Sequence, residues 1–153
     1  MIIHSFPNND KPVSALGFDY GTQRIGVAFG QSLTGTAQRV CVLKARDGIP
    51  DWDQIEALIG EWKPNLFVVG IPYNLDGSES ELMVRAIKFA NRLNGRFHKP
   101  SYSMDERLSS VEAAELAVEE NSGAKKRAAI DDMAAQIILE NWFSELAASK
   151  KLR

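Results

Sequence analysis

The run "NLFVVGIP", residues 65–72, constrains the fold of this chain more than any other stretch. It is short and almost continuously apolar, which is typical of a strand buried on both faces of a parallel sheet. Such a strand needs helices on both sides of its sheet to cover it. The run therefore favours an α/β fold.

The first third of the chain predicts three strands. Residues 13–20, 23–30 ("QRIGVAFG") and 36–45 ("TAQRVCVLKA") are rich in apolar and β-branched residues, and short polar or glycine-containing segments separate them. Turns this short join antiparallel strands. We therefore expect an antiparallel meander before the parallel part of the sheet.

Helical periodicity begins after residue 50. Asp51 is a candidate N-cap with Gln54 at the capping-box spacing, and Pro64 is expected to end the helix. The pattern predicts further helices over about 80–94, from Ser109 or Ser110 onward, and over about 128–148, with another strand within 97–106. The order β-β-β-α-β-α-β-α-α predicts a mixed sheet flanked by helices.

Length and composition predict one domain over residues 13–148, after a flexible lead-in at 1–12 and before a C-terminal tail at 149–153. The single cysteine, Cys41, excludes an intrachain disulfide and a cysteine-built zinc site. A net charge of −2 argues against a protein that coats polyanions generally, but it is compatible with a nucleic-acid enzyme. Without a signal-peptide pattern or a long apolar run, we expect a cytoplasmic protein with no membrane partner.

Asp19 is a charged residue inside an apolar, glycine-rich run, "LGFDYGTQRIGVAFG" at residues 16–30. A buried carboxylate costs several kcal/mol unless a cation or strong donors satisfy it. Asp19 is therefore either a turn residue or part of a site. If it belongs to a site, Gly17 and Gly21 are expected to leave room beside it for a metal ion and a phosphate.

Two further acidic positions are candidates for the same site. Asp105 and Glu106 fall where the carboxyl ends of parallel strands should meet. On a helical wheel Asp131 lies at the centre of the apolar stripe of the last helix, which comprises Ala135, Ile138, Trp142 and Leu146. Carboxylates that converge in this way favour Mg²⁺ or Mn²⁺, and the two histidines of the chain argue against a histidine-rich zinc site.

Each of these acids also has a simpler interpretation. Asp19 could cap the turn that follows it through an Asx hydrogen bond. Asp131 could be a first-turn carboxylate that the helix dipole favours. Glu106 could pair with Arg107 or with another surface cation. The residue pattern leaves these alternatives open.

Four stretches together resemble the YqgF (RuvX) family: "LGFDYGTQRIGVA", "VVGIPYNLDGSES", "MDERLSSVEA" and "KKRAAIDDMAAQIILENWF". They occur in the order and spacing of that family, and the resemblance spans roughly residues 14–146. Its members are small bacterial proteins with an RNase H-like fold, described as Holliday junction resolvases and as nucleases that mature the 5′ end of pre-16S rRNA. The resemblance implies a five-stranded mixed sheet of order 3-2-1-4-5, with strand 2 antiparallel.

The resemblance also assigns roles to the acids. It places the metal ligands on Asp19, Glu106 and Asp131, with Asp105 in reserve for Glu106. It implies phosphodiester hydrolysis with two Mg²⁺ or Mn²⁺ ions, in which Asp19 would bridge the metals. This chain has Ala134 where the related RuvC resolvases carry a further acid, which weakens the case for junction resolution.

A second group of residues is expected to contact the substrate: Arg24, Asn74, Asp76, Ser78, Arg107, Lys125, Lys126 and Arg127. Their alternative interpretations are surface arginines, turn and cap residues, and a solvated basic run. Arg85, Lys88 and Arg92 form a stripe on the helix over about 80–94, which we expect to face solvent.

These features together predict a metal-dependent endonuclease for structured nucleic acid, acting in 5′-end processing of pre-16S rRNA. One alternative is a Holliday junction resolvase for branched DNA, and another is a non-catalytic RNA-binding factor in ribosome biogenesis or transcription. An actin-like ATPase or sugar kinase would need two RNase H-like lobes, and 153 residues supply one. The expected partners are an rRNA precursor or branched DNA and the ribosome, and the chain acts as a monomer or a homodimer.

Overall fold

The computed structural model describes residues 1–8, 10–73, 76, 78–105 and 124–151, with only the helical backbone for 124–132 and 151. The chain forms six strands in this part, namely β1 (Ser14–Asp19), β2 (Arg24–Gln31), β3 (Thr36–Arg46), β4 (Ile49–Pro50), β5 (Leu66–Ile71) and β6 (Ser101–Asp105). The helices described are α1 (Trp52–Trp62), α2 (Glu81–Phe97) and α4 (Ala124–Lys151).

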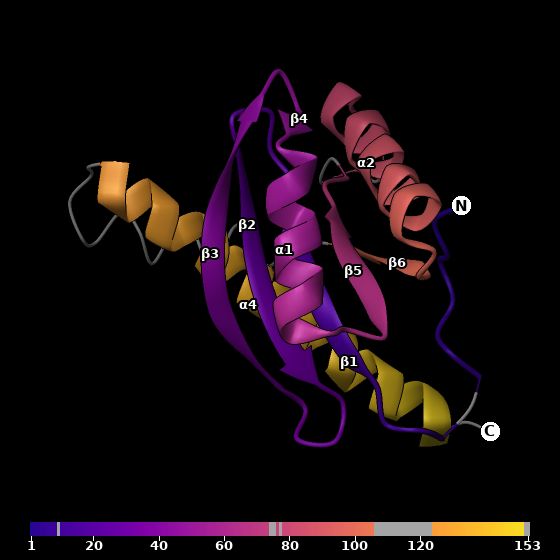
Figure 1. Cartoon of the computed structure of the whole chain (residues 1–153). Helices are drawn as coiled ribbons and strands as arrows, with labels where there is room; N and C mark the ends of the chain where they lie inside the picture. Colours follow the sequence, from indigo (N-terminus) through magenta and orange to yellow (C-terminus); the bar gives the residue numbers. More distant parts are fainter. Residues whose placement is uncertain (9, 74–75, 77, 106–123, 152–153) are drawn as a thin grey trace.

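The strands form one mixed sheet in the order β4-β3-β2-β1-β5-β6 (Figure 1). Strands β1 to β4 pair antiparallel, whereas β1, β5 and β6 run parallel. This confirms the predicted fold class and the order of the five predicted strands. The two-residue strand β4 is an addition, because it arises only where the chain folds back on the end of β3 after a turn at Asp47 and Gly48.

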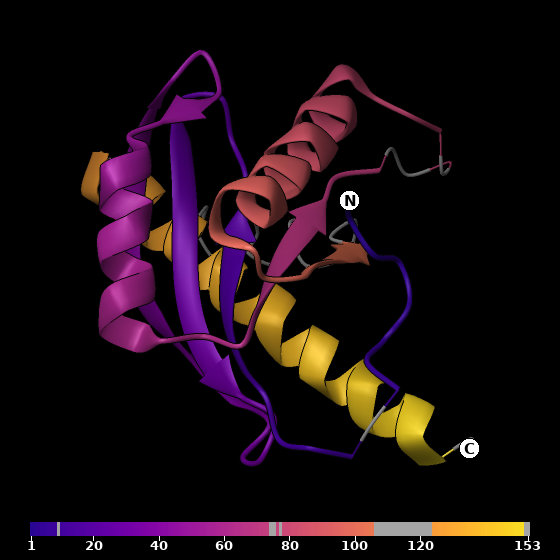
Figure 2. The same cartoon turned by 45° about the vertical axis from the view of Figure 1, so that its right-hand side comes forward.

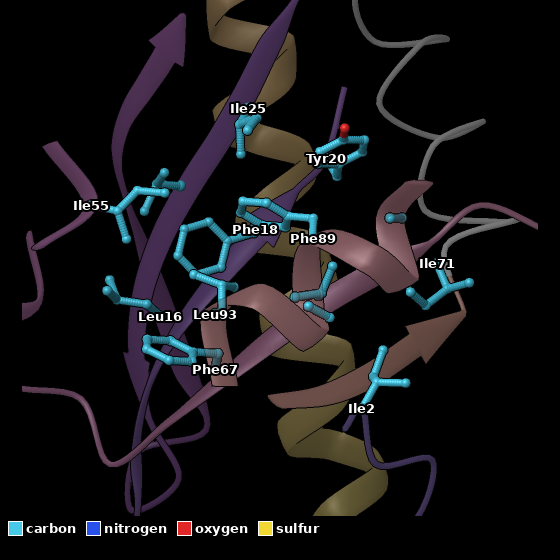
Figure 3. Packing of buried hydrophobic residues seen from close by; sticks show 14 of the residues in the cluster. Ile2, Leu16, Phe18, Tyr20, Ile25, Ile55, Phe67, Ile71, Phe89 and Leu93 are labelled. Atoms are coloured by element: carbon cyan, nitrogen blue, oxygen red, sulfur yellow. The ribbon is translucent and has the colours of Figure 1, made fainter. Parts of the chain in front are cut away.

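Helices cover both faces of the sheet, with α1 and α2 on one side and α4 crossing the other (Figures 1 and 2). The core on the α1/α2 side includes Leu16, Phe18, Phe67, Phe89 and Leu93. Figure 3 shows Phe18, Tyr20 and Phe89 close together within this cluster, with the Phe89 ring centroid 5.5 Å from that of Phe18 and 5.1 Å from that of Tyr20. The continuous burial of β5 between these layers explains its uniformly apolar sequence.

The helix ends follow local capping chemistry. The Asp51 carboxylate accepts a hydrogen bond from the Asp53 amide, which confirms the predicted start of α1, and Lys63 adopts a left-handed conformation before Pro64. Helix α2 begins after the Ser80 cap and ends three residues beyond the predicted boundary. Helix α4 spans more residues than the predicted 128–148. The helix predicted from Ser109 or Ser110 lies outside the described residues.

The N-terminal residues contact the edge of the sheet. Ile3 forms a parallel bridge with Tyr102 of β6, and the side chain of Ile2 is buried. The terminal ammonium donates a hydrogen bond to the Asn94 side chain over 2.7 Å. The start of the predicted lead-in is thus paired with β6, which covers part of an otherwise open strand edge. Among the described helices, none combines the length and apolarity needed to span a bilayer.

Candidate active site

Asp19 is the last residue of β1 and is partly buried. Successive residues of a strand face opposite sides of the sheet. Leu16 and Phe18 pack on the α1/α2 side, and Ala15 packs on the α4 side. Asp19 therefore faces the α4 side of the sheet, at the edge where the parallel strands β1, β5 and β6 end.

Two glycines flank Asp19 on the neighbouring strands. Gly26 of β2 is its partner in the antiparallel register. Gly70 of β5 follows Val69, the partner of Phe18, and so comes next to Asp19 on the other side. Only backbone lies at these two strand positions, which permits close approach to the Asp19 carboxylate.

Gly17 and Gly21, the glycines that the sequence singled out, are needed for helix packing and for a turn. A Cβ on Gly17 would lie 3.1 Å from Leu139 Cβ and 3.4 Å from the Ala135 carbonyl oxygen, so helix α4 occupies the space above this residue. A Cβ on Gly21 would lie 2.5 Å from the Arg24 carbonyl oxygen, which makes Gly21 a requirement of the turn. The glycines next to Asp19 on the neighbouring strands are therefore Gly26 and Gly70, which the sequence did not single out.

Helix α4 brings the position of Asp131 toward Asp19. From the carboxyl end of α4 toward its amino end, Phe143 lies against Gly30, and then Leu139 and Ala135 lie against Gly17. Because Gly30 pairs with Ala15, this is a progression toward the end of β1 that carries Asp19. Residue 131 lies one turn, or about 6 Å along the axis, before Ala135. Its side chain lies outside the described residues.

Asp105 ends β6 at the same edge, two strands from β1, which corresponds to about 10 Å. Tyr102 and Met104 pack toward α4, so strand alternation turns Asp105 to the opposite face from Asp19. Glu106 lies outside the described residues. Within the part of the chain that the structure describes, no three His, Cys, Asp or Glu residues form a group able to hold a metal ion.

Arg24 shares a face with Asp19. It begins β2 two residues before Gly26, so it also faces α4 and is a diagonal neighbour of Asp19 across the strand pair. Lys44 of β3 is the register partner of Arg24, which places two cations side by side near the end of β1. Lys44 was not predicted from the sequence, because only the strand register, which includes a bulge between Val27 and Ala28, pairs it with Arg24.

The other predicted substrate residues are only partly described. The Asp76 carboxylate accepts a hydrogen bond from the Ser78 amide over 2.9 Å, in the exposed segment that follows the carboxyl end of β5. This is an Asx turn, as the alternative interpretation of these two residues expected. Asn74, Arg107 and the side chains of Lys125, Lys126 and Arg127 lie outside the described residues.

A cleft opens on the opposite face of the sheet, beside Tyr20. It has a volume of about 220 Å³ and is lined mainly by Tyr20, the turn at Asp47 and Gly48, and the cations Arg85, Lys88 and Arg92 of α2. Burial raises the pKa of the Tyr20 hydroxyl, and the positive charges of Arg85 and Arg92 oppose that effect. The stripe predicted to face solvent therefore also lines a cleft, which the helical spacing alone could not reveal.

The RuvX family model, described as Holliday junction resolvase, matches residues 13–145. The chain belongs to the RuvX family. This match confirms the resemblance seen in the sequence motifs, and it covers every element from β1 through most of α4.

Relatives and solved structures agree with this membership. A Pseudomonas fluorescens protein named "Putative pre-16S rRNA nuclease" is 54% identical over 134 residues, which cover 86% of this chain and 92% of the relative. A Pseudomonas aeruginosa protein of the same name is 51% identical over 140 residues, covering 90% and 96%. Thermus thermophilus RuvC in complex with a Holliday junction substrate has a TM-score of 0.52 at 14% identity, covering 89% of this chain and 96% of RuvC. Fowlpox virus resolvase has the same TM-score at 11% identity, covering 87% and 98%. These structures establish the resolvase-type fold of the chain.

Proposed function

We propose that this chain is a metal-dependent endonuclease that hydrolyses a phosphodiester bond of structured RNA in the cytoplasm, in the maturation of the 5′ end of pre-16S rRNA. The observation that carries the proposal is the position of Asp19, at the carboxyl edge of the sheet, between two glycines and facing α4. Relatives above 50% identity bear the name of a pre-16S rRNA nuclease, which supports RNA as the substrate.

The donor set suits a hard divalent cation. Asp19 offers a carboxylate with backbone alone at the flanking strand positions, and we assign Glu106 and Asp131 as its fellow ligands. The orientation of Asp105 away from the α4 face supports Glu106 over Asp105 as the second ligand. When bound, two Mg²⁺ or Mn²⁺ ions would activate a water molecule and stabilise the leaving oxygen.

The remaining residues would bind and orient the RNA. Arg24 and Lys44 form a cationic pair beside the Asp19 edge, suited to the phosphate next to the one that is cut. The basic run Lys125–Arg127 and the segment with Asp76 and Ser78 are assigned to more distant contacts.

Branched DNA is the second candidate substrate, because the matching family is described as Holliday junction resolvase. Ala134 argues against the acidic set of RuvC, because this buried residue carries no carboxylate. A ribosome-associated monomer would suffice for RNA processing, whereas the two-fold symmetry of a junction would require a homodimer.

The test compares wild type with Asp19→Asn on a pre-16S rRNA fragment and on a four-way DNA junction, in Mg²⁺ and in excess EDTA. Asp51→Asn is the matched control, because it makes the same chemical change at a helix cap where Asn serves equally well. We expect Asp19→Asn to cleave the RNA about 100-fold more slowly or worse, equivalent to roughly 3 kcal/mol of lost transition-state stabilisation. Equal cleavage by Asp19→Asn, or cleavage in EDTA, would refute the metal site. RNA binding without any cleavage by wild type would favour the non-catalytic factor.

A further inference from the structure

The cleft between α2 and the turn at Asp47 and Gly48 carries more positive than negative charge. Arg85 forms an ion pair with Asp47 over 3.0 Å and a looser one with Glu81 over 3.8 Å. Among the described residues, neither Lys88 nor Arg92 has an ion-pair partner, and both side chains are exposed. Two uncompensated cations therefore line the cleft of a chain whose net charge is −2.

The walls of the cleft are held in place by specific contacts. The Tyr20 hydroxyl donates a hydrogen bond to the Gly48 carbonyl oxygen over 2.9 Å, and the Gly48 amide bonds the Thr22 carbonyl over 2.8 Å. Gly48 has a φ of +81°, and a Cβ on it would lie 2.1 Å from the Tyr20 hydroxyl oxygen, so only glycine fits there. On the far wall Trp52 stacks on Phe89, with ring centroids 5.8 Å apart. The cleft is thus formed before any ligand arrives.

The size of the cleft limits its occupant. Pockets that enclose whole small molecules usually measure roughly 300–1,000 Å³, and this one measures about 220 Å³. Arg96 lies over the Trp52 ring, 4.4 Å from its centroid, and Phe89 stacks on the same indole. The Trp52 ring is therefore not available to stack on a base of the ligand. The cleft suits a phosphate with part of its sugar, bound through charge and hydrogen bonds.

The cleft also adjoins the proposed active site. Tyr20 directly follows Asp19, and strand alternation sends the two side chains to opposite faces at the end of β1. Consecutive Cα atoms are about 3.8 Å apart, so the two sites are separated only by the end of the strand. A nucleic-acid strand that passes over this edge can reach both.

We propose that Lys88 and Arg92, with the cleft beneath them, bind a backbone phosphate of the single-stranded flank of the RNA whose scissile phosphate lies at Asp19. The inference rests on the proposed function for the identity of the strand. It assigns to α2 a substrate-positioning surface on the face of the sheet opposite the acids. Because the contacts are to phosphate, they select a strand that extends beyond the cleavage point and carry no base specificity.

The experiment measures binding in EDTA, by fluorescence anisotropy across a salt series, of a stem-loop RNA with a single-stranded flank and of the same stem-loop without it. The test variant is Lys88→Gln with Arg92→Gln. The matched control is Lys63→Asn with Lys99→Gln, which removes two cations near the amino ends of β5 and β6, and asparagine tolerates the left-handed conformation of Lys63. Thermal unfolding confirms that both variants are folded.

We expect the test variant to bind the flanked RNA several-fold more weakly and to lower the slope of log K against log salt by about 0.7, the value for one lost phosphate contact with a single strand. The RNA without a flank should bind the test variant and wild type alike. The control variant should retain the wild-type preference for the flanked RNA.

Three results would overturn the inference. One is an unchanged slope for the flanked RNA with the test variant. Another is an equal loss of affinity for the test variant and the control. The third is a loss of affinity of the test variant for the RNA without a flank that equals its loss for the flanked RNA, which would place the two cations on the stem-loop and not on the flank. Since binding is measured in EDTA, these outcomes are independent of cleavage by Asp19→Asn, which tests the proposed function separately.

Discussion

Replacement of Gly17 by valine tests whether the close approach of α4 to β1 holds the site together. A Cβ at this position would already lie 3.1 Å from Leu139 Cβ, 3.3 Å from Leu139 Cδ2 and 3.4 Å from the Ala135 carbonyl oxygen. The two further methyl groups of valine would have to displace the helix. Overpacking of this kind costs roughly 1–3 kcal/mol, and we expect the upper part of that range because backbone as well as side chain stands in the way.

For a chain of this length, about 2–3 kcal/mol corresponds to a fall in the unfolding temperature of roughly 4–12 °C. The assay is thermal unfolding followed by circular dichroism, together with the RNA cleavage rate at a temperature where the variant is fully folded. The cleavage rate should also fall, because a displaced α4 moves residue 131 relative to Asp19.

Gly60→Ala is the matched control. Gly60 lies in the exposed part of α1, and a Cβ there would meet nothing within 4 Å. Alanine should therefore raise the stability by about 0.5–1 kcal/mol through its helix propensity, with no change in cleavage. A Gly17→Val protein that melts at or above the wild-type temperature would refute the interpretation of Gly17 as a packing residue.

Three further predictions concern capping, pH and salt. Ser80→Ala should destabilise the chain by about 1 kcal/mol in urea unfolding, because the Ser80 hydroxyl accepts a hydrogen bond from the Met83 amide and donates one to the Pro72 carbonyl oxygen. Ser80→Asp should retain most of this stabilisation. Equal losses of unfolding free energy in the two variants would contradict the capping role. The pKa of Tyr20 is raised above its ordinary value of 10.0, so the contribution of its hydroxyl to stability is complete below pH 10 and is lost as the pH rises through the folded-state pKa. The difference in unfolding free energy between wild type and Tyr20→Phe should therefore narrow above pH 10. A difference that stays constant with pH would contradict this prediction. Replacing the basic run Lys125–Arg127 with alanine should reduce the slope of log K for RNA binding against log salt by about 2. An unchanged slope would show that the run is a solvent-exposed surface that does not contact the RNA.

Local patterns in the sequence predicted most of the fold. The apolar run of β5, the caps at Asp51 and the helical periodicity of α2 are properties of short segments, and short connections then fix which strands are antiparallel. The strand order beyond this came from the resemblance to a family. Strand β4 was missed because two residues carry no period, and it depends on the left-handed turn at Asp47 and Gly48.

The candidate site was predictable only in part. The charge of Asp19 in an apolar strand marked the edge where the site would lie, and the structure places Asp19 there. Gly17 is required because Leu139 of the last helix packs closely on it, and no local sequence pattern connects these two residues. The pairing of Lys44 with Arg24 requires the strand register, and the cleft under Lys88 requires the turn at Gly48 to face α2. These features are tertiary, so residue spacing along one element cannot supply them.

The most direct test of the account is the anomalous difference map of a crystal soaked in Mn²⁺. We expect Mn²⁺ density beside the Asp19 carboxylate on the α4 side of the sheet, shared with Glu106 and Asp131, and we expect this density to be lost in Asp19→Asn. A fully soaked wild-type crystal with Mn²⁺ elsewhere and none at Asp19 would refute the metal site at this edge of the sheet.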